Sequence, residues 1–233
     1  MITDTFVTPG NATDASVHSA RIQYQIDKYD FQTEAVCADA GYDFAEIHHD
    51  MLERGIKTYI PARKSKVKDD DYFSSDVFVY DPETNTLICP NNQRLYAATY
   101  RPGTGTVQYR CLKKSCSMCP LKSKCLRGKS SFREIILSYY KAATDMQHQN
   151  NGTPEYHAAL RLRQIWCEGN FSHQKANHNL TRIRKRGLGK AFEHCLLSAT
   201  AFNLKRMVKL LTKQFPPLIS FILEIRYAIP SRV

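Results

Sequence analysis

The chain has 233 residues, of which 42% are hydrophobic and 24% are charged, an ordinary composition for a globular protein with a sizeable core. It contains no apolar run near the ~18 residues of a membrane-spanning helix and no N-terminal signal peptide pattern, which argues against a membrane or secreted protein. The formal net charge is +11, and in the cytoplasmic protein that we expect, the eight cysteines are thiols or metal ligands rather than disulfides.

The N-terminal part of the sequence predicts a parallel α/β layer. ITDTFVTPGN, residues 2–11, is typical of a strand that ends in a turn, and spaced apolar residues predict an amphipathic helix over 14–33. EAVCADAGY, residues 34–42, contains a short apolar strand. DFAEIHHDMLERGI, residues 43–56, has helical periodicity, and KTYIPAR, residues 57–63, is another short strand. Strand, helix and strand with short connections favour parallel pairing.

The pattern then changes. Residues 65–131 are charged, rich in turns and hold five of the eight cysteines, and VFVYDPETNTLICP, residues 77–90, predicts a hairpin. Helical patterning returns at Thr153, where Thr-Pro-Glu is typical of a helix N-terminus, and we expect a long helix as far as Lys175. GKAFEHCLLSATAFNLKRMVKLL, residues 189–211, is apolar around much of its circumference and predicts a core helix.

Together these elements predict an α/β protein with an inserted cysteine-rich module. Residues 1–64 form the first part of the main domain, residues 65–131 the insertion and residues 132–213 a helical remainder. The tail, residues 214–233, has no interpretable pattern.

The positive charge is concentrated in the second half of the chain. Residues 1–100 carry nine Lys or Arg against sixteen Asp or Glu. Residues 101–133 carry nine basic residues and no acid, and residues 161–213 carry twelve basic residues against two acids. Two such regions are the electrostatic footprint of a protein that binds a nucleic-acid backbone. A solvated basic surface is the alternative.

Two carboxylates stand out by position. Asp39 ends an apolar strand, where α/β sheets gather their ligands, although a turn Asp that caps the next helix is the alternative. Glu168 lies in the second basic region and shares a helix face with Lys175, seven residues later. A carboxylate there can ligate a divalent cation while basic side chains hold phosphates, and a salt bridge to Arg163 or Lys175 is the alternative. Two-metal phosphoryl transfer normally requires a third acid.

Other polar residues near Asp39 have simpler explanations. Asp43 and Glu46 lie in the first turn of the predicted helix, where acids suit the helix dipole. His48 and His49 are adjacent on that helix and point in different directions, which makes them a poor metal-binding pair.

The cysteine block predicts a metal site. Cys111, Cys116, Cys119 and Cys125 are closely spaced, and Cys89 lies upstream on the predicted hairpin. A C-x2-C pair with two further cysteines can converge on Zn²⁺ with tetrahedral geometry. Because five cysteines compete for four positions, Cys89 can replace Cys111 or Cys125. An iron–sulfur cluster and free thiols are the alternatives.

Several stretches resemble, in order and spacing, the catalytic half of bacterial insertion-sequence transposases of the DDE type. They are ITDTFVTPGNATD, ADAGYDFAEIHHDMLERGI, YIPARK, the block ending in CSMCPLKSKC, and RQIWCEGNFSHQKANHNLTRIRKRGLGKAFEHCLLSATAFNLKRM, and they cover roughly residues 1–213. The resemblance implies an RNase H-like mixed sheet flanked by helices, in which three acids bind two Mg²⁺ or Mn²⁺ ions. It also implies cleavage of double-stranded DNA at element ends and transfer of the freed 3′-hydroxyl to target DNA, with a homodimer on DNA as a further expectation.

The resemblance assigns roles to individual residues. Asp39 matches the family's second aspartate and Glu168 its glutamate, so both are expected Mg²⁺ ligands. Lys175 matches a lysine that contacts a terminal phosphate, and Arg163 resembles the basic residue shortly before the glutamate. The family's first aspartate lies on a strand upstream of the segment equivalent to ITDTF, so we expect an N-terminally truncated transposase that lacks its first strand and is weakly active or inactive alone. The other basic residues expected to contact DNA are Lys113, Lys114, Lys122, Lys124, Arg182, Arg184, Lys185, Arg186 and Lys190.

A function from another class is also compatible with the sequence. A non-catalytic, zinc-containing DNA-binding protein derived from a transposase would keep the basic regions and the cysteine block without performing chemistry. The absent upstream aspartate favours loss of activity under either interpretation.

Overall fold

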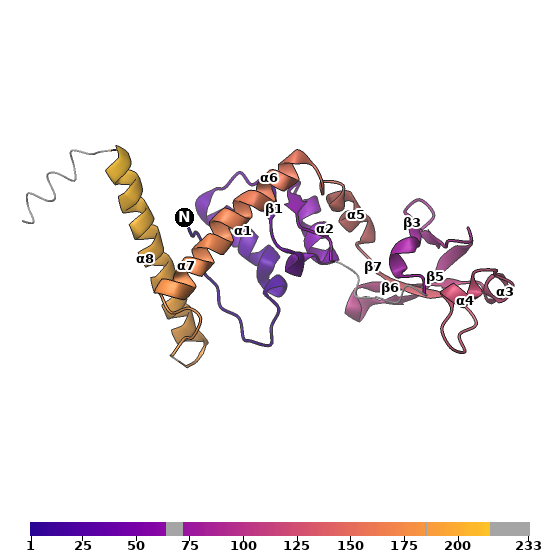
Figure 1. Cartoon of the computed structure of the whole chain (residues 1–233). Coiled ribbons are helices and arrows are strands. Elements are labelled where there is room, and N and C mark those ends of the chain that lie inside the picture. Colours follow the sequence, from indigo (N-terminus) through magenta and orange to yellow (C-terminus); the bar gives the residue numbers. More distant parts are fainter. Residues whose placement is uncertain (64–71, 185, 215–233) are drawn as a thin grey trace, which may run out of the picture. The chain divides into compact units, whose positions relative to one another are not determined.

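The structure is a computed structural model that describes residues 1–63, 72–184 and 186–214 (Figure 1). The predicted tail therefore lies almost wholly outside the described residues. The chain divides into two compact units. One consists of Met1–Gln32 with Arg161–Val233, and the other of Thr33–Leu160.

The Thr33–Leu160 unit contains the predicted strand–helix–strand arrangement. Strands β1 (Ala35–Cys37) and β2 (Lys57–Tyr59) pair in parallel, with Val36 opposite Thr58. Helix α2 (Ala45–Glu53) connects them after the short 3-10 turn η2 (Ala40–Tyr42). The parallel pairing expected from the sequence is confirmed.

Helix α5 (Lys141–His148) packs against α2 and β2, and a buried amide holds it there. Gln147 Nε2 donates to the carbonyl of Ile56 at 2.9 Å, and Gln147 Oε1 accepts from the backbone N–H of Thr58 at 3.0 Å. Met51 and Ile60 are completely buried in the same unit. Gln147 thus satisfies two backbone groups at the edge of β2 that would otherwise be buried without partners.

The second sheet of this unit has five antiparallel strands in sequence order. The strands are β3 (Val79–Asp81), β4 (Thr86–Ile88), β5 (Arg94–Arg101), β6 (Thr106–Cys111) and β7 (Glu134–Ser138). The β3–β4 pair confirms the predicted hairpin, and Asn85 occupies its turn with φ 48°, a backbone conformation that asparagine tolerates. The buried core of the sheet consists of Phe78, Leu87, Leu95, Val107, Tyr109, Cys111, Cys116 and Ile135.

Short helical segments precede and connect these strands. The turn η3 (Ser75–Val77) comes before β3, η4 (Pro102–Thr104) links β5 to β6, and α3 (Lys113–Ser117) and α4 (Lys122–Cys125) lie between β6 and β7. Helices α3 and α4 carry Cys116 and Cys125 of the cysteine block.

The other unit is helical. Its elements are η1 (Asp14–Val17), α1 (His18–Tyr29), the end of α6 (Pro154–Arg163), the π-helical turn η5 (Gln164–Glu168), α7 (Gly169–Asn177) and α8 (Leu188–Gln214). The predicted helix N-terminus is confirmed, because Thr153 Oγ1 accepts from the backbone N–H of Tyr156 at 3.2 Å. The predicted long helix is present but contains a π turn at Gln164–Glu168.

The strand predicted over residues 2–11 is wrong, because the structure has no strand there. Side chains take over the backbone hydrogen bonds at the start of this segment. Asn203 of α8 accepts from the backbone N–H of Ile2 at 2.8 Å and donates to its carbonyl at 2.7 Å. Tyr29 Oη donates to the carbonyl of Thr3 at 2.9 Å. The local pattern was strand-like, but these contacts with α1 and α8 decided the conformation.

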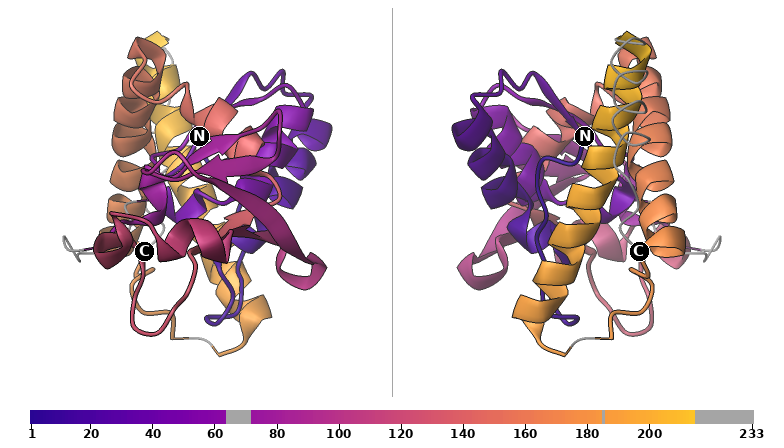
Figure 2. Two further views of the ribbon diagram at one scale, coloured as in Figure 1. Left: turned by 90° about the vertical axis from the view of Figure 1, so that its right-hand side faces the viewer. Right: turned by 90° about the vertical axis from the view of Figure 1, so that its left-hand side faces the viewer.

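Helix α8 forms as predicted and is long and uninterrupted (Figure 2). Its predicted core position is wrong, because Ser198 and Ala199 are its only buried residues in the described part of the chain. Leu197, by contrast, is 60% exposed. None of the described helices combines the length and the apolar content that crossing a bilayer requires.

Candidate functional site

Asp39 lies at the carboxyl end of β1 and begins the turn η2. Its Oδ1 accepts from the backbone N–H of Gly41 at 2.8 Å, and the residue is exposed. A Cβ on Gly41 would lie 2.7 Å from that oxygen, so glycine is the residue that this arrangement accommodates. Asp39 therefore makes the turn contact expected of a capping aspartate, and its role as a metal ligand stays a prediction.

Arg63 holds the loop that contains this carboxylate. Its backbone N–H donates to Asp43 Oδ2 at 2.7 Å, its Nε donates to the carbonyl of Ala40 at 2.9 Å, and its Nη2 donates to the carbonyl of Gly41 at 2.7 Å. The guanidinium also lies 4.0 Å from the ring centroid of Phe44. The sequence indicates only that Arg63 ends a predicted strand. Its role could not be predicted, because the carbonyl groups that it contacts lie more than twenty residues earlier in the chain.

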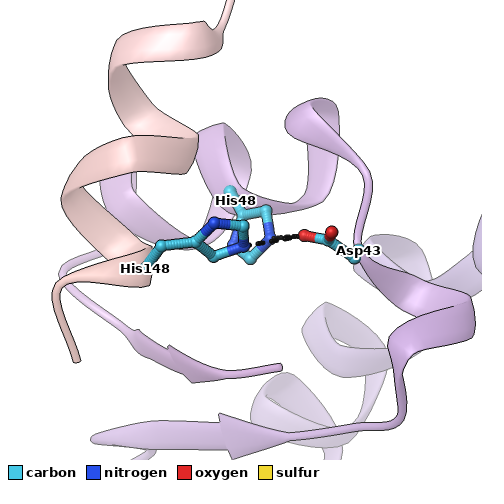
Figure 3. A group of neighbouring side chains, drawn as sticks. All are labelled: Asp43, His48 and His148. Atoms are coloured by element: carbon cyan, nitrogen blue, oxygen red, sulfur yellow. Dashed lines mark hydrogen bonds and ion pairs between the residues drawn. The ribbon is translucent and has the colours of Figure 1, made fainter. Parts of the chain in front are cut away.

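One carboxylate oxygen of Asp43 accepts hydrogen bonds from two histidine rings (Figure 3). His48 Nε2 and His148 Nε2 each lie 2.8 Å from Asp43 Oδ1. His48 Nδ1 lies 2.8 Å from Thr58 Oγ1. The expectation that Asp43 merely suits the dipole of α2 was therefore wrong, because α5 brings His148 to it from 105 residues away.

Hydrogen bonds keep Asp43 ionised despite its position. Burial raises the pKa of its carboxyl, but hydrogen bonds from His148, from His48 and from the backbone N–H of Arg63 outweigh that effect and hold the pKa well below its ordinary value. The carboxylate is therefore a fixed negative charge between two histidines. His49 does not take part, since its ring stacks on Tyr140 with centroids 4.0 Å apart.

Glu168 is the last residue of the π turn η5. Its Oε1 accepts from Arg163 Nη2 at 2.7 Å, and its side chain is 53% exposed. The salt bridge considered for Glu168 is thus present, and at this exposure it contributes well under about 1 kcal/mol to stability. Lys175 is exposed on α7, seven residues later. π turns within α-helices occur frequently at functional sites.

A groove of about 440 Å³ lies in the helical unit beside the residues that flank Glu168. Trp166 and Phe171 line it together with the N-terminal segment, residues 1–6. Both aromatic side chains are substantially exposed, and the Arg206 guanidinium lies 4.3 Å from the Trp166 ring centroid. The structure places Asp39 and Glu168 in different units, so neither unit contains both carboxylates.

The cysteine block surrounds one small cavity. The cavity has a volume of about 20 Å³ and is lined by Cys89, Cys111, Cys116, Cys119 and Cys125. Burial, followed by contacts with Cys116 and Cys89, raises the pKa of the Cys111 thiol to about 12. In the described residues no three of these sulfur atoms all lie within 4.8 Å of one another. The fold therefore gathers all five predicted cysteines, and which of them bind metal stays a prediction.

The predicted DNA-contacting residues are exposed in both units. Lys113 and Lys114 lie on α3, and Lys122 and Lys124 lie on α4. In the helical unit the exposed members of the set are Lys175, Arg182, Arg184, Arg186 and Lys190, whereas Arg163 is partly buried. Lys185 falls outside the described residues.

Comparison with known proteins identifies the family. A family described as "Transposase DDE domain" matches residues 88–208, which is more than half of the chain. No curated protein and no solved structure matched the chain significantly. The matched segment contains the cysteine block, Glu168 and Lys175, whereas Asp39 precedes it. The chain therefore belongs to the transposase DDE domain family.

Proposed function

We propose that the chain is the catalytic part of a DNA transposase with an RNase H-like fold, which cleaves and transfers strands of double-stranded DNA as a homodimer. Asp39 and Glu168 are two of its metal-binding acids. The observation that carries the proposal is the family match, because it includes Glu168 and Lys175 on one continuous helical segment. Asp39 at the carboxyl end of a parallel strand supports its assignment as the other acid.

The available donor atoms suit the cation that this family implies. Asp39 and Glu168 are exposed carboxylates, and oxygen ligands of this kind suit Mg²⁺ and Mn²⁺. When bound, such ions activate the attacking oxygen and stabilise the leaving oxygen of a phosphodiester. Arg63 holds the loop of Asp39, and Arg163 orients the Glu168 carboxylate. Lys175 offers an exposed positive charge to a DNA phosphate.

The test compares two acids in the same basic region. Glu168→Gln keeps the shape of the side chain and removes its charge, and Glu193→Gln is the matched control, since Glu193 is the only other acid in residues 161–213. We expect Glu168→Gln to reduce nicking and strand transfer on a labelled element end by at least about 100-fold, the scale for losing one group that stabilises transition-state charge. Glu193→Gln keeps the wild-type rate.

A second readout keeps the test informative where strand cleavage is weak. Binding of Mn²⁺ to the protein–DNA complex, followed by electron paramagnetic resonance, weakens in Glu168→Gln and not in Glu193→Gln. Equal Mn²⁺ binding and equal cleavage by both variants would exclude Glu168 as a metal ligand.

We further propose that residues 65–131 form an inserted module whose cysteines bind Zn²⁺. The cavity that all five cysteines line and the buried Cys111 and Cys116 support this proposal. Four thiolates around one ion are the usual ligands of a structural zinc site. Strands β3 to β6 lie wholly within these residues, and β7, which completes their sheet, follows shortly after them.

Zinc content tests this part directly. Cys116→Ser removes a cysteine at the cavity, and Cys167→Ser is the control, because Cys167 is exposed and lies outside the block. We expect Cys116→Ser to lose one zinc ion per chain by elemental analysis and to unfold the five-stranded sheet at lower temperature. The same zinc content in wild type, Cys116→Ser and Cys167→Ser would contradict the assignment.

The exposed lysines of α3 and α4 beside the cysteine cavity favour one alternative, a zinc-containing DNA-binding protein without catalysis. The two functions differ in one outcome. A binding protein would hold DNA in a salt-dependent manner but would produce no nicked strand in Mg²⁺ or Mn²⁺ and show no effect of Glu168→Gln.

A further inference from the structure

Three side chains from separate segments converge beside the Asp39 loop (Figure 3). Asp43 precedes α2, His48 lies on α2, and His148 is the last residue of α5. One ligand atom from each residue lies within 4.8 Å of the other two, and no other set of His, Cys, Asp or Glu in the described ranges does the same. We propose that Asp43, His48 and His148 bind a transition-metal ion of the zinc type, at a site separate from the Asp39 and Glu168 carboxylates and from the cysteines.

The distances fit such an ion after a small adjustment. Ligand atoms about 2.0–2.1 Å from a tetrahedral Zn²⁺ lie roughly 3.3–3.4 Å apart. Asp43 Oδ1 lies 2.8 Å from each histidine Nε2, so each of these two distances must lengthen by roughly half an ångström to admit the ion. Small side-chain rotations supply this movement, and the backbone of α2 and α5 stays in place.

The surrounding hydrogen bonds orient the ligands for a metal. Thr58 Oγ1 lies 2.8 Å from His48 Nδ1 and can accept a hydrogen bond from that nitrogen. An ion that displaces the Nε2 proton now shared with Asp43 would then meet the lone pair of Nε2, while Nδ1 keeps its proton. The backbone N–H of Arg63 engages Asp43 Oδ2 at 2.7 Å, which leaves Oδ1 facing the two imidazoles. Partners of this kind fix the tautomer and the ring orientation of metal-binding histidines.

Burial and ligand type define the class of ion. The side chain of His48 is completely buried, whereas those of Asp43 and His148 are 11% and 23% exposed. The site is therefore enclosed on the side of α2 and reachable from solvent beside His148. Two imidazoles with one carboxylate favour Zn²⁺, Co²⁺ or Ni²⁺ over Mg²⁺, which prefers oxygen ligands.

An ion at this position has a structural consequence. It ties the loop after β1 to helix α2 and to the end of α5, and so adds a bond to the packing and hydrogen bonds that already join these segments. Because Asp39 lies four residues before Asp43 on that loop, the ion would restrict the motion of the Asp39 backbone. The ion acts on position only and does not depend on any catalytic role of Asp39.

Metal binding by the full chain tests the proposal. The protein is stripped with a chelator and reloaded with Zn²⁺ or Co²⁺, as wild type and as His148→Ala, which removes the most accessible ligand. His49→Gln is the matched control, because this histidine is adjacent to His48 but stacks on Tyr140. We expect His148→Ala to bind one ion fewer per chain, or to bind that ion more than about 100-fold more weakly. His49→Gln retains the wild-type stoichiometry.

Spectroscopy separates this site from the cysteines and from folding defects of the variants. In a Cys116→Ser background four cysteines still line the cavity, so the signal of this site is the set of visible Co²⁺ d–d bands that disappears on adding His148→Ala while any thiolate charge-transfer absorption stays unchanged. Wild-type protein loaded with ¹¹³Cd is expected to show a resonance typical of nitrogen and oxygen ligands. Wild-type stoichiometry in a folded His148→Ala variant, or ¹¹³Cd signals from sulfur ligands alone, would overturn the proposal. Neither readout involves DNA cleavage, so the outcome is independent of the proposed transposase activity.

Discussion

Arg63 and Asp43 are joined by a 2.7 Å hydrogen bond from the backbone N–H of the arginine to Oδ2 of the aspartate. The Arg63 side chain adds two hydrogen bonds to the carbonyls of Ala40 and Gly41. A residue that follows β2 thus fixes the conformation of the loop that follows β1. Within that loop the backbone N–H of Gly41 donates to Asp39 Oδ1, so Arg63 acts on Asp39 through the backbone that carries it.

Truncating Arg63 should release the Asp39 loop. Arg63→Ala removes both guanidinium hydrogen bonds and keeps the backbone bond to Asp43. Because the residue is exposed, we expect a loss of only about 1 kcal/mol in the free energy of unfolding, with a larger relative loss of strand cleavage. Urea unfolding and a nicking assay measure the two effects. Arg54→Ala is the comparison, because Arg54 caps the far end of α2 and pairs with Asp50 instead of the Asp39 loop. Equal effects of the two substitutions on cleavage would refute the role of Arg63.

Adding one methyl group at Gly41 should displace the Asp39 carboxylate. The new Cβ would lie 2.7 Å from Asp39 Oδ1, and the flexible side chain can move away at little cost. Gly41→Ala is therefore expected to change the free energy of unfolding by less than about 1 kcal/mol while lowering Mn²⁺ binding and cleavage at least tenfold. Gly103→Ala, where a Cβ meets nothing within 4 Å, should leave both unchanged. Wild-type cleavage by Gly41→Ala would show that the position of Asp39 is not critical.

The ionised state of Asp43 predicts an acid-dependent loss of stability. Its pKa is lowered in the folded protein from an ordinary value of 3.8, so its contribution is fully present above that value and is lost as pH falls through the lower, folded pKa. The difference in unfolding free energy between wild type and Asp43→Asn should therefore shrink as the pH falls below about 4. Chemical denaturation at several pH values measures it. A difference that stays constant down to about pH 2 would contradict the assigned shift.

The buried amide of Gln147 should be important for stability. Gln147→Leu leaves the N–H of Thr58 and the carbonyl of Ile56 without their side-chain partner, and each buried unsatisfied group costs about 1–3 kcal/mol. We expect a loss of roughly 2–4 kcal/mol in the free energy of unfolding. Gln149→Leu, an exposed position one residue beyond α5, should change it by less than about 0.5 kcal/mol. Similar losses for the two variants would exclude the proposed bridge.

Local sequence patterns predicted the elements whose conformation depends on nearby residues. The strand, helix and strand around Asp39, the β3–β4 hairpin and the N-cap of α6 at Thr153 are all present. The gathering of five cysteines around one cavity followed from their close spacing, although the fold also brings Cys89 to it. In each case short-range periodicity or spacing carried the information.

Features that depend on distant contacts were missed. The partner of Asp43 and His48 is His148, and no local pattern links α5 to that loop. Residues 2–11 alternate as a strand would, but Asn203 satisfies the backbone of Ile2 instead. The apolar residues of α8 predicted burial, yet Leu197 remains exposed. Tertiary contacts decided these outcomes, and a pattern read along one chain does not contain them.

The contact between Gln147 and β2 also limits how the small parallel sheet can grow. The N–H of Thr58 and the carbonyl of Ile56 face away from β1, and the Gln147 amide occupies both. An additional strand would have to form its hydrogen bonds with those same two groups. Helix α5 therefore blocks strand addition at the edge formed by β2. Another strand, from this chain or from a second molecule, can add only to the opposite edge of the sheet, which β1 forms. One amide side chain therefore protects half of the sheet from edge-to-edge aggregation.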